Sequence, residues 1–170
     1  MLDRIPRLET DRLLLRGPEA SDFDLYRRFY ADAEASHFYG GPLRADQAWK
    51  VLAQQIGHWQ LRGYGLWMLE ERKSGAALGG CGLYWAEGWP RPELTWWLLR
   101  EARGQGYATE ASKAVIAYAK GRTGWPGVET HMDDNNEPAR RLALRLGGRL
   151  IAREPFPDGR DRNVYRLDDS

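Results

Sequence analysis

The chain has 170 residues, the length of one ordinary domain, which is enough to bury a hydrophobic core of its own. Basic and acidic residues nearly balance, and the formal net charge of +1 argues against a nucleic acid or an acidic membrane as the partner. No apolar run approaches the roughly 20 residues that cross a bilayer, and the first residues lack a signal-peptide core, so we expect a cytoplasmic protein with one domain over residues 1–170.

The use of cysteine agrees with a reducing compartment. Cys81 is the single Cys, so it forms no internal disulfide and cannot build a metal site alone, and we expect no metal. It lies in the apolar run LGGCGLYW, where a small buried residue is more common than a nucleophile. Eight Trp residues are many for one domain and indicate either a large aromatic core or an aromatic-lined pocket.

The first half of the chain predicts two helices between strands. Residues 11–17 (DRLLLRG) favour a short strand, and the aromatic residues of 23–32 recur at helical spacing behind a Ser-Asp cap. After a GGP turn, residues 45–63 place large apolar side chains at steps of three and four, which indicates a second amphipathic helix. Residues 65–72 and 77–85 predict two strands of an antiparallel hairpin.

The strongest predicted strand is PELTWWLLRE, residues 92–101. Bulky side chains occupy both of its faces, so we expect it at the centre of a sheet. Helices and hairpins occur together, which predicts an α/β (α+β) fold with a mixed sheet. The later predicted elements are a helix at 109–122, a strand at 127–133, a helix at 136–148 and strands at 149–156 and 161–168.

The segment EARGQGYATEA, residues 101–111, connects the strongest strand to a helix. Free amides at a helix N-terminus, with the helix dipole behind them, form an anion site. Gly104 and Gly106 would let an anion approach the backbone, Arg103 would add a cation and Thr109 a hydroxyl. The same glycines also suit a plain turn from strand to helix. No Lys-Ser/Thr follows them and a third Gly is missing, which disfavours a nucleotide P-loop and a dinucleotide fingerprint.

Four segments, in this order along the chain, resemble the GNAT superfamily of acetyl-CoA-dependent N-acetyltransferases, particularly the branch of ribosomal-protein N-terminal acetyltransferases. The resemblance implies a mixed, mostly antiparallel sheet of six to seven strands, splayed between the fourth and fifth, with about four flanking helices. It implies acetyl-CoA as co-substrate and direct acetyl transfer to a primary amine, either a protein N-terminus or a small molecule. The segments are LETDRLLLRGPEASDFDLY, ALGGCGLYW, ELTWWLLREARGQGYATEA and NNEPARRLALRLGGRLIAR.

The resemblance also implies how the loop binds the cofactor's pyrophosphate, which is through backbone amides. The family pattern of Gln or Arg, two residues, Gly, one residue, and Gly or Ala is met by Arg103, Gly106 and Ala108. In the alternative register, RGQG is aligned and Glu101 takes the first position, which removes one cation but leaves the amides in place. The residues implied are Arg103, Gly104, Gln105, Gly106, Tyr107 and Ala108, with Thr109 close behind.

Two further contacts are implied for the cofactor's pantetheine arm. In the family this arm lies where the fourth and fifth strands splay and pairs with the fourth strand, which implies the main chain of Trp97, Leu98 and Leu99. Asn136 matches an Asn that hydrogen-bonds the arm. Asn is also a good helix N-cap, and the two roles are compatible.

Acetyl transfer needs a base that takes a proton from the amine, and Glu93 matches an acidic position at the start of the family's fourth strand. The alternatives are that Glu93 forms a salt bridge at an exposed strand end, or that His131 is the base. Ala139 and Ala143 stand where family members carry Ser or Tyr, so no general acid is visible on that helix. Water, the helix terminus or a tyrosine would then serve the thiolate, with Tyr107 and Tyr165 as candidates.

The acceptor is the least determined part of the prediction. A catalytically idle acyl-CoA-binding sensor is the main alternative to an enzyme, and a nucleotide-binding module is a third. An aromatic-rich surface and the final strands are compatible with a homodimer. Aromatic candidates for the acceptor pocket, which also suit a core, are His37, Phe38, Tyr39, Trp59, Trp85 and Trp89, and acidic candidates are Asp32, Glu34, Glu87 and Glu93.

Overall fold

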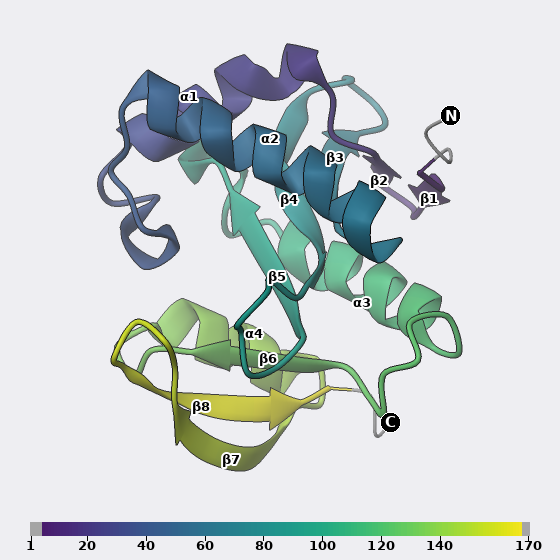
Figure 1. Cartoon of the computed structure of the whole chain (residues 1–170). Helices are drawn as coiled ribbons and strands as arrows, with labels where there is room; N and C mark the ends of the chain where they lie inside the picture. The colour runs from purple at the N-terminus through teal and green to yellow at the C-terminus, as the bar shows by residue number, and fades with distance from the viewer. Residues whose placement is uncertain (1–4, 168–170) are drawn as a thin grey trace.

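The computed structural model describes residues 5–167 and contains two antiparallel sheets, one of five strands and one of three (Figure 1). Strand order is β1-β2-β3-β4-β5 in the large sheet and β6-β8-β7 in the small one. The strands are β1 (Leu8–Glu9), β2 (Leu13–Arg16), β3 (Leu66–Glu71), β4 (Ala77–Tyr84), β5 (Glu93–Leu98), β6 (Glu129–Met132), β7 (Arg149–Pro155) and β8 (Asp161–Arg166).

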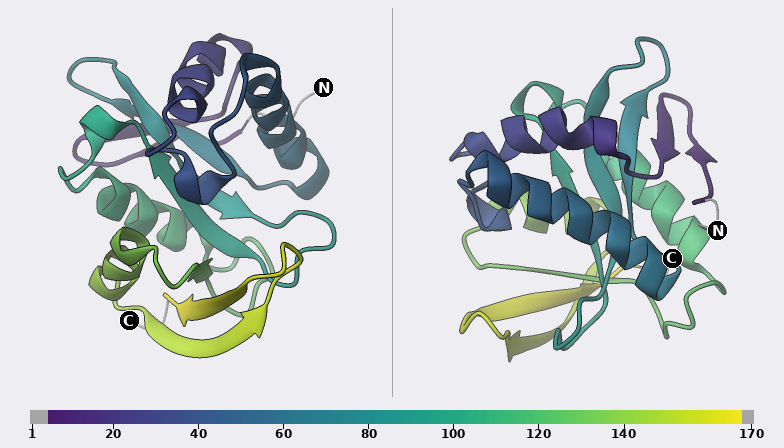
Figure 2. Two further views of the ribbon diagram at one scale, coloured as in Figure 1. Left: turned by 90° about the vertical axis from the view of Figure 1, so that its left-hand side faces the viewer. Right: turned by 45° about the horizontal axis from the view of Figure 1, so that its top comes forward.

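Within the described residues, four α-helices cover the sheets. In the right-hand view of Figure 2, the two N-terminal helices lie in front of the large sheet and the third helix lies behind it. None of the helices in residues 5–167 has the length and hydropathy to cross a membrane. The helices are α1 (Phe23–Ala31), α2 (Ala45–Arg62), α3 (Tyr107–Ala119) and α4 (Glu137–Arg145), with short 3-10 turns at Ala20–Asp22, His37–Tyr39 and Arg100–Ala102.

Strand alternation divides the core between the two faces of the large sheet. On β5, Leu94 and Leu98 pack with the cluster that includes α3, whereas Trp97 packs with α1 and α2. On β3, Trp67 faces the α3 side and Met68 the opposite side. Because successive side chains of a strand point to opposite faces, a strand between two helix layers is apolar on both. The bulky residues on both faces of β5 are buried as expected, but the prediction that this strand lies at the centre of a sheet is wrong, because β5 is the last strand of the large sheet. Helix layers on both faces, and not strands on both edges, account for its apolar pattern.

The two sheets separate between β5 and β6. β5 is the last strand of the large sheet, β6 is the first of the small one, and no ladder joins them. A side-chain hydrogen bond crosses the gap, from the Thr130 hydroxyl to the carbonyl oxygen of Leu94 at 2.9 Å. The predicted α/β fold, splayed at this point and flanked by four helices, is confirmed.

A few boundaries differ from those predicted. The two-residue strand β1 brings the strands within residues 5–167 to eight. β5 ends at Leu98 because the chain then turns into a 3-10 helix, in which the Ala102 amide donates to the Leu99 carbonyl at 3.0 Å. α3 begins at Tyr107, two residues before the predicted start, because Gly106 takes the N-cap position. Asp168, the predicted end of the last strand, lies outside the described residues.

Candidate functional site

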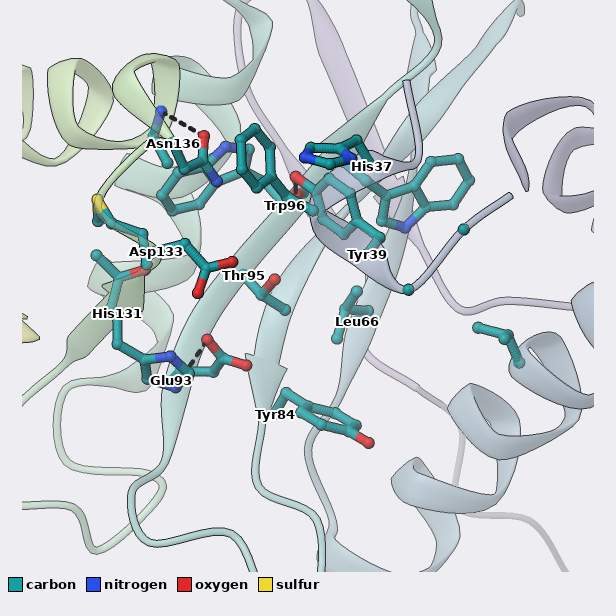
Figure 3. Close-up of a pocket in the computed structure, with 18 of the residues that line it drawn as sticks. His37, Tyr39, Leu66, Tyr84, Glu93, Thr95, Trp96, His131, Asp133 and Asn136 are labelled. Atoms are coloured by element: carbon teal, nitrogen blue, oxygen red, sulfur yellow. Dashed lines mark hydrogen bonds and ion pairs between the residues drawn. The ribbon is translucent and has the colours of Figure 1, made fainter. Parts of the chain in front are cut away.

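A cleft of about 680 Å³ opens where β5 and β6 separate. Its walls come from α1, α2 and the segment between them, from β5 and β6, from the start of α4 and from the turn between β7 and β8. Figure 3 shows side chains from the two sheets facing each other across it. A cleft between diverging strands therefore gathers residues from nearly the whole chain.

Glu93 and His131 meet on the floor of this cleft (Figure 3). Glu93 begins β5, His131 lies in β6, and the Glu93 Oε2 atom is 3.0 Å from the His131 Nε2 atom. The side chains are 14% and 1% exposed, so water screens neither group well. Burial raises the pKa of Glu93 to about 8, against the opposing positive charge of Arg162. Glu93 is thus a buried carboxyl group and not a residue at an exposed strand end.

The same burial acts in the opposite sense on His131. Burial, together with the positive charges of Arg162 and Arg91, lowers the pKa of His131 to about 3. The imidazole is therefore neutral at ordinary pH. Of the two base candidates, Glu93 is the group whose pKa falls in a useful range for proton transfer.

One edge of β5 is unpaired and faces the cleft. The Leu99 amide donates to the Leu78 carbonyl of β4 at 2.9 Å, and Trp97 pairs with Gly80 of the same strand. Because backbone groups alternate along a strand, the amide and carbonyl of Leu98 point the other way, toward β6. Of the three residues predicted to pair with the pantetheine arm, Leu98 is the one whose main chain faces the gap.

The neighbouring edge group already has a partner. The Tyr39 hydroxyl, from the segment between α1 and α2, donates to the Trp96 carbonyl oxygen. Together with the Thr130 contact to Leu94, this bond satisfies two carbonyls on the β6 side of the strand. Any ligand that pairs with β5 at Trp96 must therefore compete with Tyr39.

The glycine-rich loop has the backbone conformation that an amide cradle needs. Gly104 and Gly106 have φ values of 74° and 81°, in the region that glycine tolerates best. The first hydrogen bond of α3 runs from the Glu110 amide to the Gly106 carbonyl at 3.1 Å. The amides of the first three helical residues therefore have no acceptor within the helix. These amides are those of Tyr107, Ala108 and Thr109.

Arg103 is not a free cation in this loop. Its amide donates to the Arg100 carbonyl at 3.2 Å, and its guanidinium donates to the Ala35 carbonyl at 3.0 Å. The backbone amide and the guanidinium of Arg103, both predicted to bind the pyrophosphate, therefore already donate hydrogen bonds within the protein. The unengaged part of the predicted cradle runs from Gly104 to Thr109.

Arg12, which was not predicted as a site residue, directly precedes β2 and holds the glycine-rich loop in place. Its guanidinium donates to the Gln105 carbonyl at 2.8 Å, pairs with Glu110 at 2.7 Å and lies 4.5 Å from the centre of the Tyr107 ring. Only the packing of two distant segments reveals such a role, because a charged residue at the start of a strand is common.

Asn136 lies at the other end of the cleft, before α4 (Figure 3). Its Oδ1 atom accepts from the Ala139 amide at 3.3 Å, so the predicted N-cap role is confirmed. This bond uses only the side-chain oxygen. The amide nitrogen of the same side chain is left for a ligand in the cleft, and the two predicted roles remain compatible.

The predicted proton donors for a leaving group lie elsewhere. The Tyr107 hydroxyl donates to the Glu71 carboxylate at 2.8 Å, and Tyr165 is buried in the large core cluster. Neither lines the cleft, whereas Ala139 does. Burial raises the pKa of Tyr30, which does line the cleft, to about 12, so its hydroxyl keeps its proton.

The acceptor-side aromatics divide between the cleft and other places. His37, Phe38, Tyr39 and Trp89 line the cleft, whereas Trp59 is in the core and Trp85 borders a separate groove. Of the four acidic candidates only Glu93 lines the cleft. The other three pair with arginines on the surface, Asp32 and Glu34 with Arg100, and Glu87 with Arg62. Charged residues of the cleft that the sequence reading missed are Asp133, Asp158, Arg160 and Arg162.

Comparison with known proteins gives a consistent result. Residues 12–149 match the model of the acetyltransferase (GNAT) domain. A curated relative, the uncharacterized N-acetyltransferase YoaA of Bacillus subtilis, is 25% identical over 170 residues, covering 95% of this chain and 96% of YoaA. The crystal structure of an acetyltransferase from Agrobacterium tumefaciens is 32% identical and covers 98% of this chain and 96% of its own, with a TM-score of 0.86.

A third similarity concerns the fold alone. The ribosomal L7/L12 α-N-protein acetyltransferase RimL, solved in complex with coenzyme A, is 16% identical with a TM-score of 0.76, covering 95% of this chain and 97% of its own.

Proposed function

Because this chain belongs to the GNAT acetyltransferase family, we propose that it moves an acetyl group from acetyl-CoA to a primary amine by direct transfer, with Glu93 as the general base. The observation that carries the proposal is the Glu93 carboxyl group, buried in the cleft between β5 and β6 with its pKa raised to about 8. A base is most effective when its pKa lies near the working pH. Glu93 meets this condition because of its burial.

The residues present fit the cofactor. Gly104 and Gly106 have positive φ values, and a Cβ atom at Gly104 would meet nothing within 4 Å, so the loop is open to a ligand. The amides from Gly104 to Thr109 would hold the pyrophosphate at the N-terminus of α3. The edge of β5 at Leu98 and the side-chain nitrogen of Asn136 would hold the pantetheine arm. When bound, acetyl-CoA supplies the acetyl thioester.

The chemistry of the protein side follows from the cleft. An ammonium acceptor gives one proton to the Glu93 carboxylate, and the burial of Glu93 favours the neutral form that results. The freed amine lone pair forms the N–C bond and the C–S bond breaks. The nitrogen then releases its second proton and the thiolate gains one, both by way of water, so that a neutral amide and a free thiol result. We assign this role to water because the α4 residue that lines the cleft, Ala139, has no hydroxyl group to donate a proton.

The same alanine supports a second candidate function. A protein that retains the amide cradle but lacks a proton donor on α4 would bind acyl-CoA without turning it over. Such a protein would act as a sensor. Glu93 argues against this alternative, because a buried carboxyl group with a raised pKa has no purpose in the binding of the cofactor's phosphates.

Two measurements separate these functions. Calorimetric titration with acetyl-CoA, coenzyme A and NAD should show micromolar binding of the first two, and the absence of such binding would overturn both candidates. Release of free thiol from acetyl-CoA should then depend on an amine, tested with peptides, polyamines, amino acids and aminoglycosides. Binding without turnover across this panel would favour the sensor.

We further propose a cytoplasmic location, supported by the buried free thiol of Cys81, which suits a reducing compartment. The homodimer predicted from the sequence stays a prediction, and so does the extent of the domain over residues 1–170.

A further inference from the structure

Four side chains form a continuous line across the floor of the cleft. Asp158, in the turn before β8, lies 2.5 Å from the Arg162 Nη2 atom, and the Arg162 Nη1 atom lies 3.3 Å from the His131 Nδ1 atom. The His131 Nε2 atom in turn lies 3.0 Å from the Glu93 Oε2 atom. The line begins at the surface and ends at the carboxyl group to which we assign proton transfer.

The contact between Arg162 and His131 determines which nitrogen carries the imidazole proton. A guanidinium group has only donors, so the Nδ1 atom that faces Arg162 must accept. A neutral imidazole has one protonated nitrogen, and the proton is therefore on Nε2. Nε2 is the atom that lies 3.0 Å from the Glu93 carboxylate, a close contact that is not aligned as a hydrogen bond in this structure and that leaves Nε2 without another partner.

Arg162 is held firmly enough to impose this arrangement. Its guanidinium lies 5.3 Å from the centre of the Trp89 ring and 4.8 Å from that of Phe156, between the ion pairs with Asp158 and, at 3.6 Å, Asp133. The imidazole is packed as well, with its centre 4.3 Å from that of the Phe156 ring. Packing on both sides limits rotation of either group.

The charged groups around His131 disfavour a second proton. Arg162 of β8 faces Nδ1, Arg91 of the loop before β5 adds a further positive charge, and Asp158 contributes an opposing negative charge from behind Arg162. Glu93 of β5 faces Nε2. A histidine that is held neutral with Nε2 protonated has no free lone pair toward the cleft, so it cannot take a proton from an amine there.

We infer that His131 is a positioning residue, which donates its Nε2 hydrogen to the Glu93 carboxylate, and that Arg162 fixes the tautomer in which it does so. This inference rests on the proposed role of Glu93. The donor orients the carboxylate and stabilises its anionic form, so that the Oε1 atom is presented to the acceptor. The proton from the amine goes to Glu93 and to no other residue of the line.

The first test needs no activity. Long-range 1H–15N NMR of the full chain, with the His131 signals assigned by their loss in His131→Gln, should show a protonated Nε2 and an unprotonated Nδ1. In Arg162→Met the Nδ1-protonated form should become detectable. A wild-type protein with the proton on Nδ1 would overturn the inference, whether or not the chain proves to be an acetyltransferase.

The second test compares two substitutions at the same position. His131→Gln keeps an N–H donor but cannot act as a base, and His131→Phe keeps a ring but loses the donor. We expect the Gln variant to retain kcat within about threefold and the Phe variant to lose about tenfold or more, because a misplaced reacting group is costly. The acidic limb of the kcat profile should move to higher pH in the Phe variant, because the carboxylate loses a hydrogen-bond donor.

A Gln variant as inactive as the Phe variant would identify His131 as the base instead and would overturn the inference. Folding of both variants is checked by thermal unfolding, and the NMR result on the wild type stands if either fails to fold. The charged and ionisable groups that face Glu93 are unchanged in both variants, namely Arg162 of β8, Tyr84 of β4 and Tyr39 of the segment between α1 and α2. Absence of acetyl transfer in the wild type, with every amine tested, would refute the proposed function and leave the tautomer assignment intact.

Discussion

The guanidinium of Arg103 donates to the carbonyl oxygen of Ala35 across 3.0 Å, and so joins the glycine-rich loop to the segment between α1 and α2. Arg100, three residues earlier, pairs with Asp32 of the same segment at 2.7 Å. The segment continues into Tyr39, which bonds to the free edge of β5. The proposed cofactor loop and the acceptor side of the cleft are thus mechanically connected.

This connection predicts the effect of Arg103→Ala. The variant should lose about 1 kcal/mol of stability in urea, as for one hydrogen bond, and its KM for the acceptor amine should rise. Arg122→Ala is the matched control, because Arg122 also donates to a carbonyl, that of Tyr118, but at the far end of α3. A similar stability loss in both variants, with the acceptor KM raised only in the first, supports the connection. An unchanged acceptor KM in Arg103→Ala would contradict it.

Replacement of Glu93 tests the general base. Removal of a general base costs about 10²- to 10⁴-fold, so Glu93→Gln should lower kcat by about this factor. In the wild type kcat should rise with pH through about 8, because Glu93 must lose its proton before it can accept another. The variant, assayed with the same amine to keep the acceptor's own titration constant, should lack this limb. Full activity of the variant across the pH range would show that another group acts as the base.

Glu93 also makes a prediction about stability. Its pKa is raised from 4.5 to about 8 in the folded protein, so between these values the folded form retains a proton that the unfolded chain has released. Stability from this group is therefore present at low pH and is lost as pH rises through about 8. Urea unfolding at about pH 5 and about pH 9 should show that Glu93→Gln gains stability relative to the wild type at the higher pH. An equal difference at both pH values would mean that the carboxyl group titrates normally.

Sequence alone predicted those features that depend on local pattern. The alternation of β5, the turn into α3 and the N-cap at Asn136 each follow from residues that are adjacent or one helical turn apart. The contact of His131 with Arg162 depends instead on register, since β6 pairs with β8 so that His131 lies opposite Val164, two residues from Arg162. A one-residue shift of this ladder would turn Arg162 away from the cleft.

The same reason explains the missed and misassigned residues. Arg12 reaches the glycine-rich loop only because β2 and α3 pack against each other, and Trp59 fills the core although its neighbours in sequence suit a pocket equally well. Composition distinguishes neither case. Whether a side chain lies in the cleft or in the core depends on how whole helices and strands pack together.

Gly106 offers a test of the amide cradle. Its φ of 81° is strained for any residue with a Cβ atom, so Gly106→Ala should cost about 1 kcal/mol or more of stability. Gly121→Ala is the matched control, because Gly121 has a φ of 74° beyond the far end of α3. Both variants should be destabilised to a similar degree, but only Gly106→Ala should weaken acetyl-CoA binding in calorimetry. Equal binding by the two variants would refute the cradle at this position.

The packing of β4 against β5 yields a last prediction. A Cβ atom at Gly80 would lie 2.5 Å from the Trp97 Nε1 atom and 3.3 Å from the Trp67 carbonyl oxygen, and the indole belongs to a packed cluster between the sheet and α1. Overpacking of this kind costs about 1 to 3 kcal/mol, so Gly80→Ala should lower the urea midpoint. Gly57→Ala, inside α2 where a Cβ atom meets nothing within 4 Å, should instead stabilise by about 1 kcal/mol through helix propensity. If the urea midpoint falls in Gly80→Ala and rises in Gly57→Ala, the effect at Gly80 comes from crowding and not from the loss of glycine's flexibility. The missing Cβ atom at Gly80 then leaves the space that the Trp97 indole occupies at the cleft wall. A gain of stability at both positions would mean that the indole can move aside.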